Sequence, residues 1–130
     1  MRTRHRALGS LLLVLAAARV SPVQAQRLTV DPERAALGRG LFQRKGCAAC
    51  HTIGKKGRKP GPDLLGVTER RTLKWLRQII KTPEQMAESD STTRSLVREY
   101  RTTMPSVDLS DPEVEGLLHY LASRSGAAGQ

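Results

Sequence analysis

The residues with the clearest capacity for chemistry form one pentapeptide, Cys47-Ala48-Ala49-Cys50-His51. Two thiols separated by two residues can lie on one short turn, and the next residue adds an imidazole. Such a pattern is typical of three kinds of site. The thiols can add to the vinyl groups at one edge of a haem whose iron binds the histidine. They can instead form a redox dithiol, or bind zinc together with a further ligand.

The N-terminal residues bear on this choice, because they predict a secretory signal peptide over residues 1–25. Three arginines within the first six residues precede an apolar run over residues 7–18, and small residues lie before a cleavage point near Ala25/Gln26. The run is shorter than the roughly 20 residues that span a bilayer, so an uncleaved membrane anchor is the less favoured alternative. We expect export to the periplasm and a single domain over residues 26–130.

Two of the three sites fit the rest of the sequence poorly. Redox dithiols of this spacing typically lie in strand-helix-strand surroundings, and this sequence has no alternating strand pattern of useful length. A zinc site needs another ligand, and the sequence has no second Cys-His cluster. The adjacent histidine and the export signal both favour covalent haem. We therefore predict that Cys47 and Cys50 attach haem and that His51 binds its iron.

An iron bound by one histidine needs a sixth ligand for electron transfer or an open position for catalysis. After loss of residues 1–25, the remaining side chains with a suitable donor are Met86, Met104 and His119. Met86 lies in a polar stretch, and His119 lies beside the apolar face of the last predicted helix, where we expect a partly solvated surface residue. Met104 precedes Pro105, whose ring fixes the backbone there. These residues alone leave the three candidates open.

All the elements that the sequence predicts are helices. Residues 54–66 contain four glycines and two prolines and are expected to form a loop. Helix-start residues, apolar spacing and the capping-box spacing of Ser110 and Glu113 locate the helices. We expect helices from Asp31 toward Lys45, from about Leu73 until Pro83 stops it, from about Thr92 to Tyr100, and from Ser110 onward.

Composition agrees with one small all-α domain. The 130 residues include 22 Lys and Arg against 12 Asp and Glu, and loss of residues 1–25 leaves 18 basic side chains and a net charge of +6. Disorder along the whole chain and a polytopic membrane protein are excluded. Four aromatic residues make a thin core for this length, so we expect a cofactor to complete the interior.

An ordered series of motifs resembles the class I monohaem c-type cytochromes and covers nearly all of the chain after residue 25. The resemblance implies a class I cytochrome c fold, with four to five helices packed around one covalently attached haem c and its iron. The motifs are Gly38 to Phe42, Cys47 to His51, Gly61-Pro62-Asp63-Leu64, Met104-Pro105, Leu109-Ser110-Asp111, and Tyr120-Leu121.

The resemblance also implies roles for particular residues. Met104 becomes the second axial ligand of the iron, and the carbonyl of Pro62 accepts a hydrogen bond from His51. Leu64 lies in the haem pocket, and Trp75 packs against the haem edge or the core, or bonds a propionate. The first and last helices should cross, so that Gly38 and Phe42 meet Tyr120 and Leu121.

Two axial ligands leave no site for a substrate at iron, so the expected function is electron transfer by a soluble periplasmic protein and not enzymatic catalysis. The alternative is a haem enzyme or ligand sensor in which Met104 is displaced. A thiol oxidoreductase is a third possibility, and it predicts titratable thiols without covalent haem.

Charge is distributed unevenly along the chain, which bears on partners. No acidic residue lies between Glu33 and Asp63, where eight basic residues occur, whereas residues 105–130 hold four acids and one base. We expect redox partner proteins with acidic docking surfaces. Export and the lack of interleaved aromatic residues argue against nucleic acid. We also expect a monomer with no stable membrane span.

Overall fold

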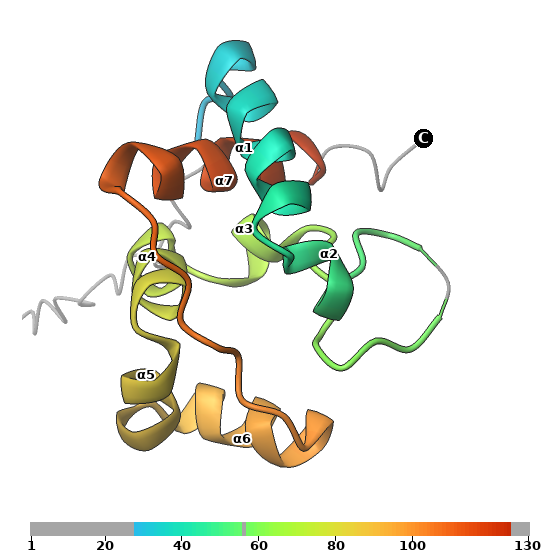
Figure 1. Cartoon of the computed structure of the whole chain (residues 1–130), viewed down its shortest axis with the longest axis vertical. Coiled ribbons are helices and arrows are strands. Elements are labelled where there is room, and N and C mark those ends of the chain that lie inside the picture. The colour runs from blue at the N-terminus through green and yellow to red at the C-terminus, as the bar shows by residue number, and fades with distance from the viewer. Residues whose placement is uncertain (1–27, 56, 126–130) are drawn as a thin grey trace, which may run out of the picture.

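The computed structural model describes residues 28–55 and 57–125 (Figure 1), so the predicted signal peptide and its cleavage point lie outside the described residues. Within the described residues all regular structure is helical, which confirms the all-α prediction. The helices are α1 (Pro32–Arg44), α2 (Cys47–Cys50), α3 (Val67–Arg70), α4 (Leu73–Lys81), α5 (Pro83–Ser89), α6 (Ser91–Tyr100) and α7 (Asp111–Ser123).

The helix ends follow the local sequence closely. Asp31 caps α1 by accepting a hydrogen bond from the backbone N–H of Arg34 at 3.0 Å. Ser110 and Glu113 form the predicted capping box at the start of α7. Five helices have seven or more residues, and the two others, α2 and α3, are single turns of four residues that periodicity cannot reveal.

Of the five longer helices, α5 was not predicted, and Pro83 explains why. Pro83 does end the preceding helix, because α4 stops at Lys81, but it is also the first residue of α5. Proline is tolerated there because the first helical N–H has no partner within the helix. Pro83 is fully buried and Met86 is 6% exposed. Helix α5 therefore packs against the rest of the fold, although its sequence is mostly polar.

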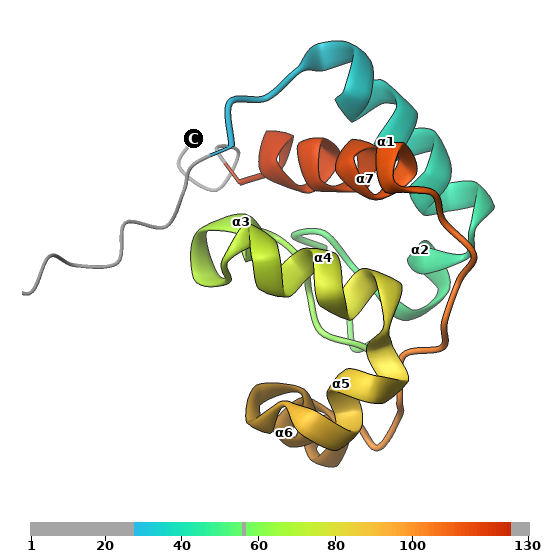
Figure 2. The same ribbon diagram turned by 90° about the vertical axis from the view of Figure 1, so that its left-hand side faces the viewer.

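The first and last helices cross at two glycines. A Cβ built on Gly38 would lie 1.9 Å from the carbonyl oxygen of Gly116, so only glycine permits this separation. Further along, the rings of Phe42 and Tyr120 pack with centroids 5.7 Å apart. The predicted crossing of α1 and α7 is therefore confirmed (Figure 2), although Gly38 meets Gly116 and not Tyr120 or Leu121.

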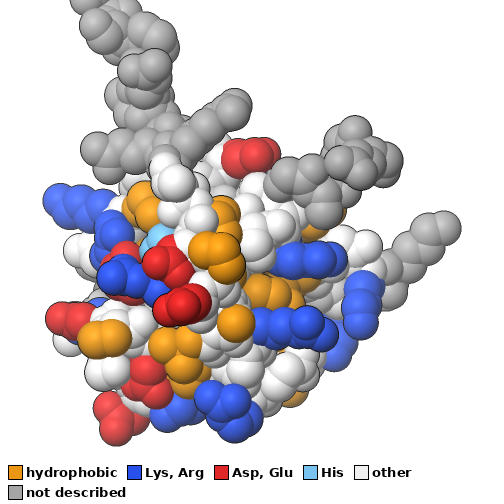
Figure 3. Space-filling model, turned by 90° about the horizontal axis from the view of Figure 1, so that it is seen from above, with side chains coloured by type: hydrophobic (Ala, Val, Ile, Leu, Met, Phe, Trp, Pro, Cys, Tyr) orange, Lys and Arg blue, Asp and Glu red, His pale blue; other side chains and the backbone are white. Residues whose placement is uncertain are grey.

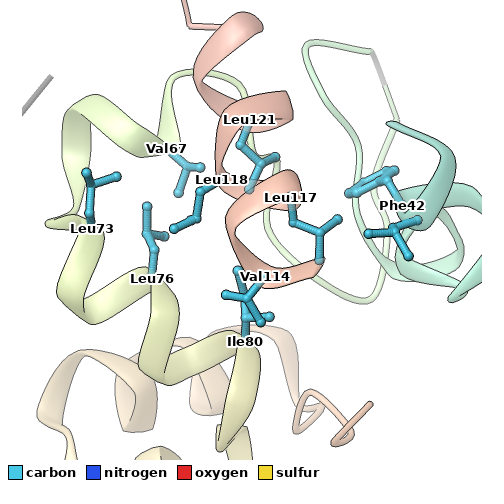
Figure 4. Packing of buried hydrophobic residues seen from close by; sticks show 10 residues of the cluster. Phe42, Val67, Leu73, Leu76, Ile80, Val114, Leu117, Leu118 and Leu121 are labelled. Carbon is cyan, nitrogen blue, oxygen red and sulfur yellow. The ribbon is translucent and has the colours of Figure 1, made fainter. Parts of the chain in front are cut away.

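The core lies between α7 and the α3–α4 segment. One face of α7 is apolar and packs toward neighbouring helices through Val114, Leu117, Leu118 and Leu121 (Figure 4). Leu118 is completely buried and Val114 is 2% exposed. On the outer side of the same contact, Arg77 of α4 donates two hydrogen bonds to Glu115 of α7.

His119 differs from the prediction of a partly solvated surface residue. Its side chain is 6% exposed, and its Nδ1 accepts a hydrogen bond from the backbone N–H of Asp31 at 2.9 Å. This contact joins α7 to the residue that caps α1, across 88 residues of sequence. A tertiary contact of that separation leaves no periodic signal in the sequence, which is why the prediction was wrong.

Helices α5 and α6 form the lower part of the molecule in Figure 1. From the end of α6, residues 101–110 return toward α7 without regular secondary structure, shown in orange in both ribbon views. We call residues 101–110 the return strap. The strap runs past α5 and α4 toward α7, and because Met104 is its fourth residue, its course determines where that thioether lies.

Candidate functional site

Helix α2 is the local structure of the Cys-Ala-Ala-Cys turn. Gly46 precedes it with φ of 79°, a left-handed conformation that favours glycine. The turn places Cys47 and Cys50 as free thiols, both partly buried, one helical turn apart. His51 follows in an extended conformation, so its side chain leaves the turn in a different direction. A single-turn helix thus groups two thiols and an imidazole, as the pentapeptide predicted.

The imidazole of His51 is oriented by the loop expected over residues 54–66. His51 Nδ1 donates to the carbonyl oxygen of Pro62, with 2.9 Å between the two atoms. A carbonyl oxygen can only accept, so Nδ1 carries the proton, and in the neutral imidazole Nε2 then keeps a free lone pair. Nε2 is the atom then available to bind a metal. Backbone hydrogen bonds from Gly61 to Cys50 and from Leu64 to Thr52, each of 2.8 Å, hold the two segments together.

Asp63 strengthens this pairing in a way that the sequence analysis missed. Its carboxylate accepts hydrogen bonds from Thr52 Oγ1, from the Gly54 N–H and from the Leu65 N–H, the latter two at 2.9 Å. Partial burial raises the pKa of Asp63, but these hydrogen bonds outweigh it and hold the pKa below the ordinary value of 3.8. An aspartate directly after a proline in a glycine-rich loop is the available signal, because aspartate often accepts from nearby backbone N–H groups.

Lys59 adds a further link between the loop and α2. Its Nζ donates to the carbonyl oxygen of Ala48 at 2.7 Å and lies 3.5 Å from that of Ala49. Basic side chains stabilise the unpaired carbonyls of a helix in this way. Lys59 therefore places a positive charge beside the carbonyls of Ala48 and Ala49, the two residues that separate Cys47 from Cys50 in the sequence.

One cavity brings the predicted site residues together. Its lining includes all seven of them: Cys47, Cys50, His51, Pro62, Leu64, Trp75 and Met104. Most of the remaining wall is apolar, and helices α1, α4, α6 and α7 contribute to it through Phe42, Leu76, Ile79, Leu96, Val97 and Leu117. Neither Met86 nor His119 lines this cavity, since Met86 is buried in α5 and His119 faces the start of α1.

Trp75 has a polar partner that sequence reasoning did not identify. Its indole N–H donates to Asp90 Oδ1 at 3.2 Å, and the guanidinium carbon of Arg71 lies 5.4 Å from the ring centroid. Asp90 also accepts from the N–H and hydroxyl of Thr93, and these bonds keep its pKa below the ordinary value. Trp75 therefore lines the cavity with its ring while its N–H is directed to the start of α6.

The cavity fits a large planar apolar group with a central metal. It offers an imidazole with a free lone pair, a thioether and two thiols within mainly apolar walls. A Cβ on Gly61 would lie 2.7 Å from the His51 ring, so glycine leaves the room that this imidazole needs. Burial raises the pKa of the Cys47 thiol, opposite to the lowered pKa that activates redox dithiols.

Comparisons with known proteins point the same way. The family model of cytochrome c matches residues 35–125. A search of curated protein sequences gives no match. Among solved structures, cytochrome c from Rhodothermus marinus is similar, with 30% sequence identity, a TM-score of 0.72, and coverage of 82% of this chain and 91% of that chain.

Two engineered forms of the Rhodothermus marinus cytochrome c are also similar. The form bound to a carbene intermediate has 29% identity and a TM-score of 0.66, and covers 85% of this chain and 89% of that chain. The other has 28% identity and a TM-score of 0.69, with coverage of 85% and 90%. Together with the helical fold and the grouped site residues, these matches show that the chain belongs to the cytochrome c family, whose members carry covalently attached haem c and transfer electrons through its iron.

Proposed function

We propose that this protein is a soluble periplasmic electron carrier whose single haem iron has His51 and Met104 as axial ligands. The observation that carries the proposal is the position of Met104. Of the three donors that the residues alone leave open, Met104 is the one that lines the cavity shared by His51 and the two cysteines. Met86 and His119 are both buried elsewhere, within other helix contacts.

In this proposal each residue of the candidate site has a defined role. The S–H bonds of Cys47 and Cys50 add across the two vinyl groups, which forms two thioethers and loses no atoms. Pro62 holds His51 through its carbonyl, which fixes the tautomer and makes Nε2 a stronger donor. Leu64 and Trp75 contribute apolar wall, which lowers the local dielectric and limits access of water.

The bound haem supplies reversible one-electron cycling between ferric and ferrous iron. A thioether ligand stabilises the ferrous form relative to a second imidazole, so the chain favours a higher potential by presenting Met104. With both axial positions filled, the chain offers no open coordination site to a substrate. Electron transfer, rather than catalysis at iron, is the function that these residues support best.

Location and domain limits are part of the same proposal. We assign residues 1–25 to a cleaved signal peptide and residues 26–130 to one cytochrome domain, because of the arginine-rich start and the short apolar run. In the part of the chain that the structure describes, no helix has both the length and the apolar character of a membrane span.

The proposed partners are redox proteins with acidic docking surfaces. We propose that this protein binds them as a monomer. Lys55 and Arg58 are exposed on the loop that carries Pro62. At the α1 and α7 end, acidic and basic side chains are interspersed, which favours docking at another face (Figure 3). Association with an acidic partner should slow as salt rises, because screening weakens the attraction between exposed charges.

Absorption spectra of the ferric protein test the axial ligands. Because a sulfur–iron charge-transfer band reports Met ligation, the parent protein should show the band and low-spin iron. Met104→Ala should lose the band and bind cyanide or imidazole readily, whereas the matched control Met86→Ala should retain it. If Met104→Ala kept the band, or if the parent protein were high-spin, the assignment of Met104 would be wrong and a displaceable ligand or another donor would take its place.

A further inference from the structure

The return strap has few backbone restraints. Among the described residues, the backbone groups of residues 102–109 form no hydrogen bond to another backbone group. Met104 and Val107 are partly buried along the cavity, while Pro105 and Ser106 are exposed. Apolar contacts alone seldom fix an extended segment in one conformation, so side-chain tethers gain importance here.

Glu84 is the tether nearest to Met104. Its Oε1 accepts the backbone N–H of Ser106 at 2.8 Å, and its Oε2 accepts the Ser106 hydroxyl. These two bonds, with the hydroxyl bond the larger cause, lower the pKa of Glu84, so the carboxylate is charged at neutral pH. A charged acceptor with two donors from one residue makes a directional contact.

The carboxylate is presented from a fixed position. Glu84 is the second residue of α5, between the fully buried Pro83 and the 6% exposed Met86. Its negative charge also lies at the positive end of the helix dipole. Buried neighbours in α5 therefore hold Glu84 in place. The strap residue that it contacts, Ser106, lies only two positions after Met104.

A second tether holds the strap from the other side. Lys45 Nζ donates to the carbonyl oxygen of Asp108 at 2.9 Å. Lys45 caps α1 and lies two residues before Cys47, so it belongs to the segment that presents the attachment turn. Glu84 and Lys45 thus restrain the strap at Ser106 and Asp108, toward α5 and toward α1.

We propose that Glu84 is a positioning residue that keeps the Met104 thioether on the iron by fixing Ser106. This inference rests on the proposed ligation by Met104. For the thioether to leave the iron, the strap must move away from the cavity, and the Glu84–Ser106 contact opposes that movement. Loss of the contact allows the strap more conformations, so the thioether departs faster while the rest of the fold is retained.

The test is the rate at which imidazole replaces the thioether in the ferric holoprotein. At saturating imidazole, release of the thioether limits this rate. Glu84→Ala should accelerate the exchange about fivefold, a modest effect because the contact is exposed to solvent. Ser106→Ala keeps the backbone bond and should accelerate it less. Adding Ser106→Ala to Glu84→Ala should change nothing more, since the carboxylate is already absent.

Two variants separate positioning from a general loss of stability. Glu84→Gln keeps an oxygen for the Ser106 N–H and a donor for its hydroxyl, so its rate should stay within about twofold of the parent. Glu88→Ala removes an exposed carboxylate of α5 that accepts no hydrogen bond among the described residues, and should leave the rate unchanged. Urea unfolding of each variant measures the global stability in parallel.

The outcomes distinguish the two proposals. If the parent protein has no sulfur–iron band, ligation by Met104 fails, and this inference fails with it. If the band is present but Glu84→Ala exchanges at the parental rate, only the role of Glu84 is overturned. Equal acceleration by Glu84→Ala and Glu88→Ala would also overturn it, because charge removal from α5 and not the Ser106 contact would then be the cause.

Discussion

Gly38 of α1 faces the carbonyl oxygen of Gly116 in α7 so closely that a Cβ on Gly38 would lie 1.9 Å from that oxygen. The obstacle is backbone, so no side-chain rotation can relieve it. This contact sets the separation of the two longest helices, and with it the position of Phe42, which lines the haem cavity. The crossing thus links a helix-packing constraint directly to the site.

Gly38→Ala should separate the two helices and lower the free energy of unfolding by about 3 kcal/mol, the upper range for overpacking a tight contact. Urea unfolding of the holoprotein measures this. Gly40→Ala is the matched control on the same helix, because its Cβ would meet only the end of the Arg44 side chain. That control should be neutral or slightly stabilising, since alanine favours a helix over glycine. Similar losses for both variants would contradict the close crossing.

The Arg77–Glu115 pair predicts a particular pH dependence. Hydrogen bonding and charge attraction from Arg77 hold the pKa of Glu115 below its ordinary value of 4.5. Because the folded-state pKa is the lower one, the contribution to stability is complete above about pH 4.5 and is lost as the pH falls through the folded-state pKa.

Glu115→Gln should therefore lower the free energy of unfolding by up to about 1 kcal/mol at pH 7, since the pair is partly exposed. The difference from the parent should shrink as the pH falls toward 3. Unfolding curves from pH 3 to pH 7 check this, with Glu69→Gln as a control, because the Glu69 side chain forms no hydrogen bond among the described residues. A difference that grew on acidification would have the wrong sign.

Trp75→Phe tests the assignment of the indole N–H to Asp90. The substitution keeps an aromatic ring at the cavity but removes the donor at 3.2 Å from Asp90. We expect the free energy of unfolding to fall by about 1 kcal/mol, with little change in the reduction potential. Asp90→Asn in the same background should add less than it does alone, because the two residues interact. A large shift of potential in Trp75→Phe would instead favour a hydrogen bond from the indole N–H to a haem propionate.

Much of this architecture was predictable because its signals are local. Asp31-Pro32 and the Ser110–Glu113 spacing locate the starts of α1 and α7, and one apolar face identifies α4. The pentapeptide predicts the attachment site because it groups two thiols and an imidazole within one turn and its flank. Ordered motifs then predicted which residues should share a cavity, and they do.

What escaped prediction depends on contacts between distant residues. The hydrogen bonds between Glu84 and Ser106 join residues 22 positions apart, and the hydrogen bond between His119 and Asp31 joins residues 88 positions apart. In sequence, Glu84 lies in a polar stretch, and His119 looks like an ordinary surface position of the last helix. Helix α5 was missed because Pro83 both ends the preceding turn of helix and begins the next helix, and the burial of Pro83 and Met86 becomes evident only in the structure.

The most direct test of the account concerns covalent attachment at the Cys47–Cys50 turn. The protein is expressed in a host with a haem-attachment system, denatured, and examined as the pyridine haemochrome together with its intact mass. The account predicts one haem bound through two thioethers, on a chain shortened near Ala25/Gln26. Cys47→Ser and Cys50→Ser should each leave at most one thioether and reduce the yield of holoprotein. A colourless parent protein with two titratable thiols would contradict the account.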